Sequence, residues 1–232
     1  MEIKINEIKR SQSVNVLIAI LVLGSLWGLS EVVLNGAIRA AGLPFRAGIL
    51  TGIGIGIMGV AIGIFRKSSI LIGIALVAIF CKQLVVPILH VSVMCKINSC
   101  LAVMLEGVAL TGVVSLAGRK LERGYLPRIA VGASGALLAS TAFYFVGMYV
   151  APCQSLLAFK HAGGLVAFLT AEGLVWAVFS AIFFPLGYWL GTRLRNTVLA
   201  LQTRKPLLYY TTSSVLVICC WATSAFAIGA GL

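Results

Sequence analysis

The sequence predicts an all-α fold, a polytopic bundle of seven helices that cross a membrane. Of its 232 residues, 60% are hydrophobic and only 10% are charged, and the mean hydropathy is +1.07. Apolar segments of about 20 residues recur along the chain, and this is the length that a hydrocarbon core about 30 Å thick requires. A soluble domain does not carry so much apolar surface, so the composition excludes that class.

Hydropathy divides the chain into four parts. Residues 1–13 form a charged arm, residues 14–192 a six-helix core, residues 193–206 a basic connector and residues 207–232 a seventh transmembrane helix. The connector reads RLRNTVLALQTRK, which is typical of an amphipathic helix on the inner membrane surface. The predicted spans, with ends accurate to roughly 2–4 residues, lie at 14–36, 47–65, 69–90, 99–118, 129–151, 163–191 and 207–230.

Local signals support several of these elements in turn. The apolar run that begins at Val14 has no small-residue cleavage site and is followed by further spans, so we expect it to be retained rather than removed as a signal peptide. Pro87 cannot donate to the carbonyl of Gln83, so we expect a kink in the third span and a free carbonyl oxygen beside Lys82. Pro185 is expected to bend the long sixth span. Small-x-x-x-small spacings, which let helices approach closely, occur at Gly24, Gly28, Gly52, Gly56, Gly59 and Gly63.

The basic residues collect on alternate loops. Of the 18 Lys and Arg, most lie on one predicted side, and the positive-inside bias makes that side the cytoplasm. We therefore expect a cytoplasmic N-terminus and an extracytoplasmic C-terminus in the cell (plasma or inner) membrane. The bias and an attraction to anionic membrane lipid explain the net charge of +12, so no nucleic acid is expected as a partner. The predicted cytoplasmic residues are Lys4, Lys9, Arg10, Arg66, Lys67, Arg119, Lys120, Arg123, Arg128, Arg193, Arg195, Arg204 and Lys205.

Ionisable residues inside the predicted spans all fall in the outer half of the membrane in this orientation. They are Glu31, Lys82, Glu106 and Glu172, each on a different helix, and Gln83 follows Lys82. An ionisable group in hydrocarbon costs a few kcal/mol on insertion scales, so such groups usually face a cavity or one another. We therefore expect them to line a polar, ligand-binding pocket near the outer surface. The alternative is that Lys82 pairs with one glutamate and serves only to hold the helices together.

Two tryptophans lie four residues from two of these glutamates. Trp27 precedes Glu31 and Trp176 follows Glu172. Since the two spans run in opposite directions, each indole is expected one turn deeper than its carboxylate, on the same helix face. Such an arrangement suits a cation or a flat heterocycle, through stacking and cation–π attraction, and Asn35 extends the Glu31 face outward. The alternative is that both indoles pack against lipid or neighbouring helices.

Histidines and cysteines gather near the predicted outer loops, and two further interpretations stay open there. The cysteines could form a disulfide outside the membrane. Together with the histidines they could instead bind a soft metal or haem iron, although Cys-x4-Cys is not a strong zinc spacing. The pocket interpretation itself requires no cofactor. The candidate metal ligands are His90, Cys95, Cys100, Cys153 and His161.

Several catalytic motifs do not occur in the 232 residues. The chain has no GxxxxGK[ST] phosphate loop, no HExxH and no GxSxG. We therefore predict that the chain is not an enzyme. An intramembrane enzyme stays open as an alternative, because catalytic groups can assemble in space without a motif in sequence.

This small, Gly-rich, basic-inside chain with an N-terminal charged arm resembles the substrate-binding S components of energy-coupling-factor transporters over roughly residues 1–195. The resemblance implies a six-helix core that holds a vitamin or metal ion near its outer face, with Glu31, Lys82, Glu106 and Glu172 as ligand contacts. It also implies partners, namely a scaffold transmembrane subunit and two ATPase subunits. The chain departs from the family in its seventh span and in its first helix, where Ala19 is followed four residues later by Leu23 instead of a second alanine.

The sequence thus predicts a membrane-embedded solute-binding subunit of an uptake transporter, which captures a small, cationic or heterocyclic, vitamin-like ligand in a pocket open to the outside. The predicted binding residues are Trp27, Glu31, Asn35, Lys82, Gln83, Glu106, Glu172 and Trp176. Two alternatives accompany this prediction. One is a haem- or metal-binding membrane subunit that uses the outer His and Cys residues, and the other is the intramembrane enzyme.

Overall fold

The computed structural model describes residues 2–231, and the side chains from Ser13 onward. Every regular element within that range is a helix and none is a strand, and seven helices are long and apolar enough to cross a membrane. The prediction of an all-α, polytopic membrane bundle is therefore confirmed. The seven membrane-length helices are Ser13–Ala40, Arg46–Phe65, Ile70–Leu89, Val93–Glu122, Tyr125–Val150, Gly164–Arg204 and Pro206–Gly229.

Several of these spans are composite, because short 3₁₀ or π segments (labelled η) interrupt the α-helices. The first span joins α1, η1 and α2, and the sixth joins α9, η4 and α10. The elements are α1 (Glu2–Leu29), η1 (Ser30–Leu34), α2 (Asn35–Ala40), α3 (Arg46–Phe65), α4 (Ile70–Lys82), α5 (Val85–Leu89), η2 (Val93–Lys96), α6 (Ile97–Ala117), η3 (Gly118–Glu122), α7 (Tyr125–Val150), α8 (Gln154–Leu157), α9 (Gly164–Phe168), η4 (Leu169–Gly173), α10 (Leu174–Arg204) and α11 (Pro206–Gly229).

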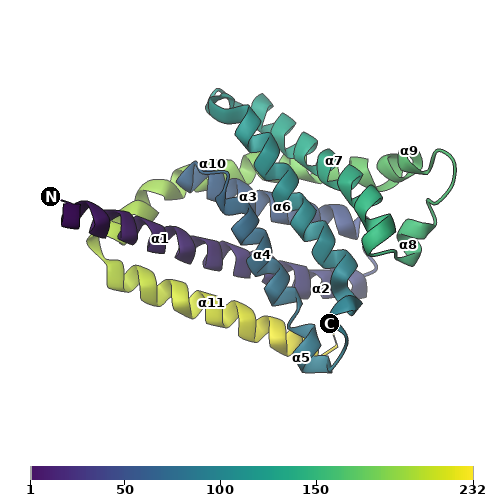
Figure 1. Cartoon of the computed structure of the whole chain (residues 1–232), viewed down its shortest axis with the longest axis horizontal. Coiled ribbons are helices and arrows are strands. Elements are labelled where there is room, and N and C mark those ends of the chain that lie inside the picture. Colours follow the sequence, from purple (N-terminus) through teal and green to yellow (C-terminus); the bar gives the residue numbers. More distant parts are fainter. Residues whose placement is uncertain (1, 232) are drawn as a thin grey trace.

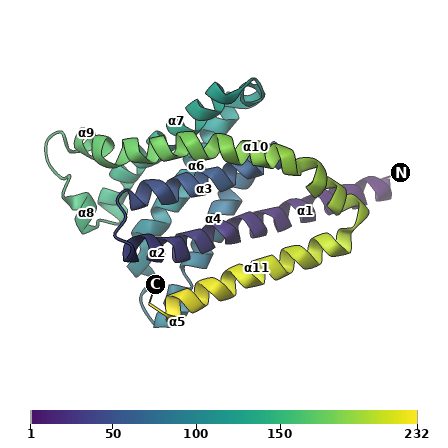
Figure 2. The same ribbon diagram turned by 180° about the vertical axis from the view of Figure 1, so that it is seen from behind.

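Six of the long helices form a closed ring. Going around it, α1 packs on α4, α4 on α6, α6 on α7, α7 on α10, α10 on α3, and α3 returns to α1 and also touches α6. The seventh, α11, lies outside the ring along α1, and Figures 1 and 2 show it as a separate rod at one edge of the molecule. The two ends of the chain lie at opposite ends of the bundle (Figure 1).

Glycine permits the closest contact in the ring, between α3 and α10. A Cβ added to Gly187 would collide with the backbone carbonyl oxygen of Gly56, and one added to Gly52 would lie 2.8 Å from the Cβ of Phe179. Across the α1–α4 contact, a Cβ on Gly24 would lie 2.5 Å from the Cβ of Val77. These small-residue faces therefore bring helices of the same chain together, because no larger side chain fits at the crossings.

Four side-chain hydrogen bonds among the described residues attach α11 to the ring, and the longest runs from the hydroxyl of Tyr209 to the carbonyl oxygen of Asn15 at 3.4 Å. Trp221 Nε1 donates to Ser25 Oγ at 2.9 Å, and the hydroxyl of Tyr210 donates to Asn15 Oδ1 at 3.1 Å, both on α1. Cys81 Sγ of α4 donates to Ser224 Oγ at 3.3 Å. Polar side chains that bond across helices hold an added span in place within an apolar surrounding.

Two features of the helices differ from the sequence-based expectation. The helix does break before Pro87, at residues 83 and 84 between α4 and α5, but the carbonyl oxygen of Gln83 accepts from Val86 N at 3.0 Å. The expectation of a free Gln83 carbonyl is therefore wrong, because a tight turn satisfies it locally. Residues 193–204 continue α10 without interruption, and α1 begins at Glu2, so neither the connector nor the arm starts a separate helix.

Candidate functional site

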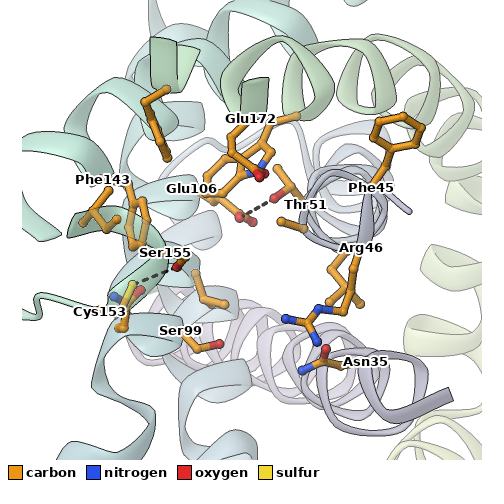
Figure 3. Close-up of a pocket in the computed structure, with 18 of the residues that line it drawn as sticks. Asn35, Phe45, Arg46, Thr51, Ser99, Glu106, Phe143, Cys153, Ser155 and Glu172 are labelled. Carbon is orange, nitrogen blue, oxygen red and sulfur yellow. Dashed lines mark hydrogen bonds between the residues drawn. The ribbon is translucent and has the colours of Figure 1, made fainter. Parts of the chain in front are cut away.

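A cavity of about 510 Å³ opens in the ring at the end of the bundle remote from α1's first turns. Residues from η1, α2, α3, α6, α7, η4 and α10 line it, together with the segment around α8 (Figure 3). Its wall is mixed, with aromatic side chains beside polar and charged ones. The polar lining is Glu31, Asn35, Arg46, Thr51, Asn98, Ser99, Glu106, Cys153, Ser155 and Glu172, and the aromatic lining is Phe45, Phe143, Phe159, Phe168 and Trp176.

Backbone irregularities carry three of the ionisable residues at this end. Glu31 lies in the π segment η1, Glu172 lies in the π segment η4, and Lys82 is the last residue of α4 before its break. A π turn inserts one extra residue into a helix, and such turns are rare and frequent at functional sites. Glu106 differs, since it lies inside the regular helix α6.

Glu31 is neutralised within the protein. Lys82 Nζ donates to Glu31 Oε2 at 2.6 Å and also to Ser99 Oγ, and each of Glu31 and Lys82 is only 6% exposed. The α1–α4 crossing at Gly28, where Cys81 packs, brings the two side chains together. Lys82 does not itself line the cavity, so it lies behind the two lining residues that it bonds.

Glu106 has no cationic partner of this kind. Its Oε1 accepts from Thr51 Oγ1 at 2.9 Å, the side chain is 3% exposed, and Oε2 has no hydrogen-bond partner among the described residues. Figure 3 shows the Thr51–Glu106 bond, which joins α3 to α6 in the wall of the cavity. One carboxylate oxygen is therefore left unpaired deep in the wall.

Glu172 and Arg46 stand nearer the mouth. Glu172 is half-buried and Arg46 is exposed, and the charge of Arg46 acts on the Glu172 carboxyl. Within residues 13–231, no hydrogen bond or ion pair joins Glu172 to another side chain. In Figure 3 the side chain of Arg46 extends toward Asn35, whereas the ring of Phe45 points away from both.

The two tryptophans occupy different environments. Trp176 is 5% exposed and lines the cavity, with its ring 5.9 Å from that of Phe143, which in turn lies 6.3 Å from Phe168. Trp27 is fully buried and packs where Gly54 leaves room on α3, outside the cavity. Neither indole Nε1 has a hydrogen-bond partner among the described side chains and backbone.

The structure brings most of the predicted binding residues to one cavity. Glu31, Asn35, Glu106, Glu172 and Trp176 line it. Lys82 reaches it through Glu31 and Ser99, whereas Trp27 and Gln83 lie outside, the latter donating from Nε2 to Cys100 Sγ at 3.3 Å. That any of these residues contacts a ligand stays a prediction.

Sequence reasoning missed several lining residues. Arg46 directly precedes the second predicted span and is not among the basic residues assigned to the cytoplasm, and Thr51 is a small polar residue in a glycine-rich span. Ser99 and Asn98 lie at the start of α6, where they are indistinguishable from loop polar residues by sequence. A signal existed only for Thr51, as a hydrogen-bonding side chain in the middle of an apolar run. The phenylalanines carry no signal that separates a pocket wall from a lipid-facing surface.

The proposed metal ligands do not converge. Among the described residues, no group of three His, Cys, Asp or Glu side chains is placed to hold a metal ion, and all six cysteines are free. His90, Cys95 and His161 are exposed and Cys100 is buried. Cys153 lines the cavity next to Ser155, with Sγ and Oγ 3.1 Å apart. The geometry therefore gives no support to the haem, metal or disulfide interpretations.

Comparison with protein-family models, with curated proteins and with solved structures found no match to this chain.

Proposed function

We propose that this chain is a membrane-embedded solute-binding subunit of an uptake transporter, and that its solute binds in the cavity lined by Glu31, Glu106 and Glu172. One observation supports this proposal above the others. Polar groups from six separate helical elements surround one cavity inside an otherwise apolar membrane bundle. The similarity in plan to S components of energy-coupling-factor transporters, with six helices in a ring, belongs to the same proposal.

The size of the cavity suits a small molecule. About 510 Å³ falls within the range of about 300–1,000 Å³ that small-molecule sites occupy. Its buried part is largely apolar and aromatic, with a small number of polar groups, which is the usual division between affinity and orientation in such sites. With the basic loops in the cytoplasm, the mouth of the cavity faces the outside, as capture for uptake requires.

An enzymatic role has one supporting contact and one argument against it. Ser99 lines the cavity and is hydrogen-bonded to Lys82, as a serine nucleophile and a lysine base are in some hydrolases. Lys82 also donates to the buried carboxylate of Glu31 at 2.6 Å, which stabilises the protonated amine. A protonated amine cannot accept the serine proton, so we favour solute binding over hydrolysis.

Native mass spectrometry of the purified chain tests the proposal through a variant that fills the cavity. Ala102 lines the cavity from α6, so Ala102→Phe is expected to expel a small molecule that co-purifies with the unmodified protein. Ala130 is exposed on α7 and outside the cavity, so Ala130→Phe adds the same bulk and is expected to leave that molecule bound.

Two results would contradict the proposal. One is a chain that carries no small molecule after mild extraction and binds none from a lysate extract. The other is retention of the same molecule by both the Ala102→Phe and the unmodified protein, because a ligand in the cavity cannot share it with a phenyl ring.

A further inference from the structure

We infer that the ligand of this cavity carries a protonated nitrogen that binds Glu106, next to a planar group with a hydrogen-bond acceptor for Trp176 Nε1. This inference deepens the solute-binding function proposed above and rests on it. It follows from the two buried polar atoms of the cavity wall that the protein leaves without partners.

The first of these atoms is an acceptor, Glu106 Oε2. The side chain is only 3% exposed and lines the cavity. Its Oε1 accepts a hydrogen bond from Thr51, whereas Oε2 has no partner among the described residues. A buried carboxylate is strongly disfavoured unless hydrogen bonds and an opposite charge compensate it. Ionisation of Glu106 therefore requires that the ligand atom that meets Oε2 is a donor.

Charge decides which kind of donor it is. Three carboxylates line the cavity, Glu31, Glu106 and Glu172, and two cations compensate them, Lys82 by a direct ion pair and Arg46 through space. When Glu106 is ionised, three negative charges face two positive charges, and one negative charge is left. Glu106 and Glu172 are the two lining carboxyl groups without an ion pair within residues 13–231, and Glu106 is the one that is buried. A ligand cation balances the site, whereas an anion would add to the excess.

The second atom is a donor, Trp176 Nε1. This indole is 5% exposed, lines the cavity and has no acceptor among the described residues. The ligand atom that meets it is an acceptor, such as a ring nitrogen or a carbonyl oxygen. Trp176, Phe143 and Phe168 form a row of tilted rings 5.9 and 6.3 Å apart, and such a wall favours a planar ring and attracts positive charge.

Trp27 supplies an internal control, because its Nε1 is also without a partner but lies outside the cavity against Gly54. Trp27→Phe and Trp176→Phe remove the same N–H from two buried indoles. Only the second is expected to change ligand binding.

Equilibrium dialysis of the full chain in nanodiscs of zwitterionic phosphatidylcholine tests the inference with four matched probes. 3-(Aminomethyl)pyridine carries both the protonated amine and the ring acceptor. Pyridine-3-methanol removes the charge, benzylamine removes the ring acceptor, and pyridine-3-carboxylate reverses the charge. We expect 3-(aminomethyl)pyridine to bind about tenfold tighter than either single deletion, and the carboxylate to bind weakest.

The variants assign each preference to its residue. Glu106→Gln keeps the shape and the Thr51 contact but removes the charge, so it is expected to abolish the advantage of the amine over pyridine-3-methanol. Trp176→Phe is expected to abolish the advantage of 3-(aminomethyl)pyridine over benzylamine, while Trp27→Phe preserves both. Size-exclusion profiles show that each variant is folded before dialysis.

Failure of this inference is distinct from failure of the proposed function. Tighter binding of the carboxylate than of the amine, or an unchanged amine preference in Glu106→Gln, overturns the inference alone. Where none of the four probes binds, the molecule that Ala102→Phe expels decides: a cation with a planar acceptor group supports the inference, and a neutral or anionic molecule overturns it. Absence of any molecule that Ala102→Phe expels overturns the proposed function and the inference together.

Discussion

The two π segments, η1 and η4, have the same local structure but different roles in the molecule. Each interrupts a membrane span near the cavity, each contains a glutamate, and each has a tryptophan four residues from that glutamate. In η1, Glu31 is 6% exposed and bonded to Lys82, and Trp27 is sealed against Gly54. In η4, Glu172 is half-buried without a bonded partner in the described part of the chain, and Trp176 lines the cavity.

The difference comes from the neighbouring helices rather than from the segments themselves. The α4 helix places an amine against η1, and a glycine of α3 makes room for its indole. Although α7 and α3 also pack on η4, no cation among the described residues forms an ion pair with Glu172, which lines the cavity with Ala171 and is influenced by the more distant Arg46. We conclude that η1 stabilises the packing of the helices through the Glu31–Lys82 ion pair. By contrast, η4 lies on the side of the cavity where polar groups are free to bind a ligand.

Breaking the ion pair of η1 is expected to have the largest effect on stability. Lys82→Met leaves the buried Glu31 carboxylate without its cation, and removal of one partner from a buried pair costs about 3–5 kcal/mol. The measurement is the free energy of unfolding in detergent micelles, by titration with sodium dodecyl sulfate.

The double variant Lys82→Met/Glu31→Gln is the control, since it removes both charges. We expect it to recover more than half of the loss, because most of that loss is the cost of an uncompensated charge rather than of a missing contact. Equal losses in the single and double variants would mean that η1 is not anchored by this pair.

Crowding the buried indole of η1 is expected to have a smaller effect. A Cβ at Gly54 would lie 2.5 Å from Cε2 of Trp27, and the rigid, fully buried ring has no free space to enter. Overpacking of this kind costs about 1–3 kcal/mol, so Gly54→Ala is expected to lower the free energy of unfolding by that amount in the same titration.

Gly112, inside α6, is the matched control for Gly54. Nothing lies within 4 Å of a Cβ built there, so Gly112→Ala is expected to leave stability unchanged or raise it by up to about 1 kcal/mol, as alanine is the better helix former. A loss in Gly112→Ala as large as in Gly54→Ala would remove the packing explanation.

The fold could be predicted from the sequence because membrane spans follow from length and hydropathy. The predicted second span, 47–65, corresponds to Arg46–Phe65, and the third, 69–90, to Ile70–Leu89. The π segments could not be predicted, since one extra residue in a helix leaves no mark on hydropathy. The full length of the sixth helix was also missed. Residues 193–204 contain several charges, so hydropathy alone ends the span before them, whereas α10 continues to Arg204.

The site could be predicted only in part, and the limit is the same for each residue that was misplaced. The rule that ionisable residues in spans face a cavity or one another identified Glu31, Lys82, Glu106 and Glu172. It could not say which glutamate Lys82 binds, because that depends on which helices cross. Spacing on one helix likewise placed Trp27 below Glu31, but Gly54 on another helix determines where its indole packs.

The charges at the mouth of the cavity are expected to affect stability least and association most, which sharpens the contrast with η1. Glu172 is half-buried and Arg46 is exposed, so Glu172→Gln and Arg46→Gln are each expected to change the free energy of unfolding by no more than about 0.5 kcal/mol.

The effects of these two substitutions on the association of a cationic probe have opposite signs, because a charge at the mouth attracts or repels the probe before it binds. Stopped-flow association of 3-(aminomethyl)pyridine at low salt should slow roughly two- to fivefold in Glu172→Gln and accelerate by a similar factor in Arg46→Gln. Both effects should shrink as salt rises, since the screening length falls from about 30 Å at 0.01 M to about 3 Å at 1 M ionic strength. Effects of the same sign in the two variants would show that these side chains act by shape rather than by charge.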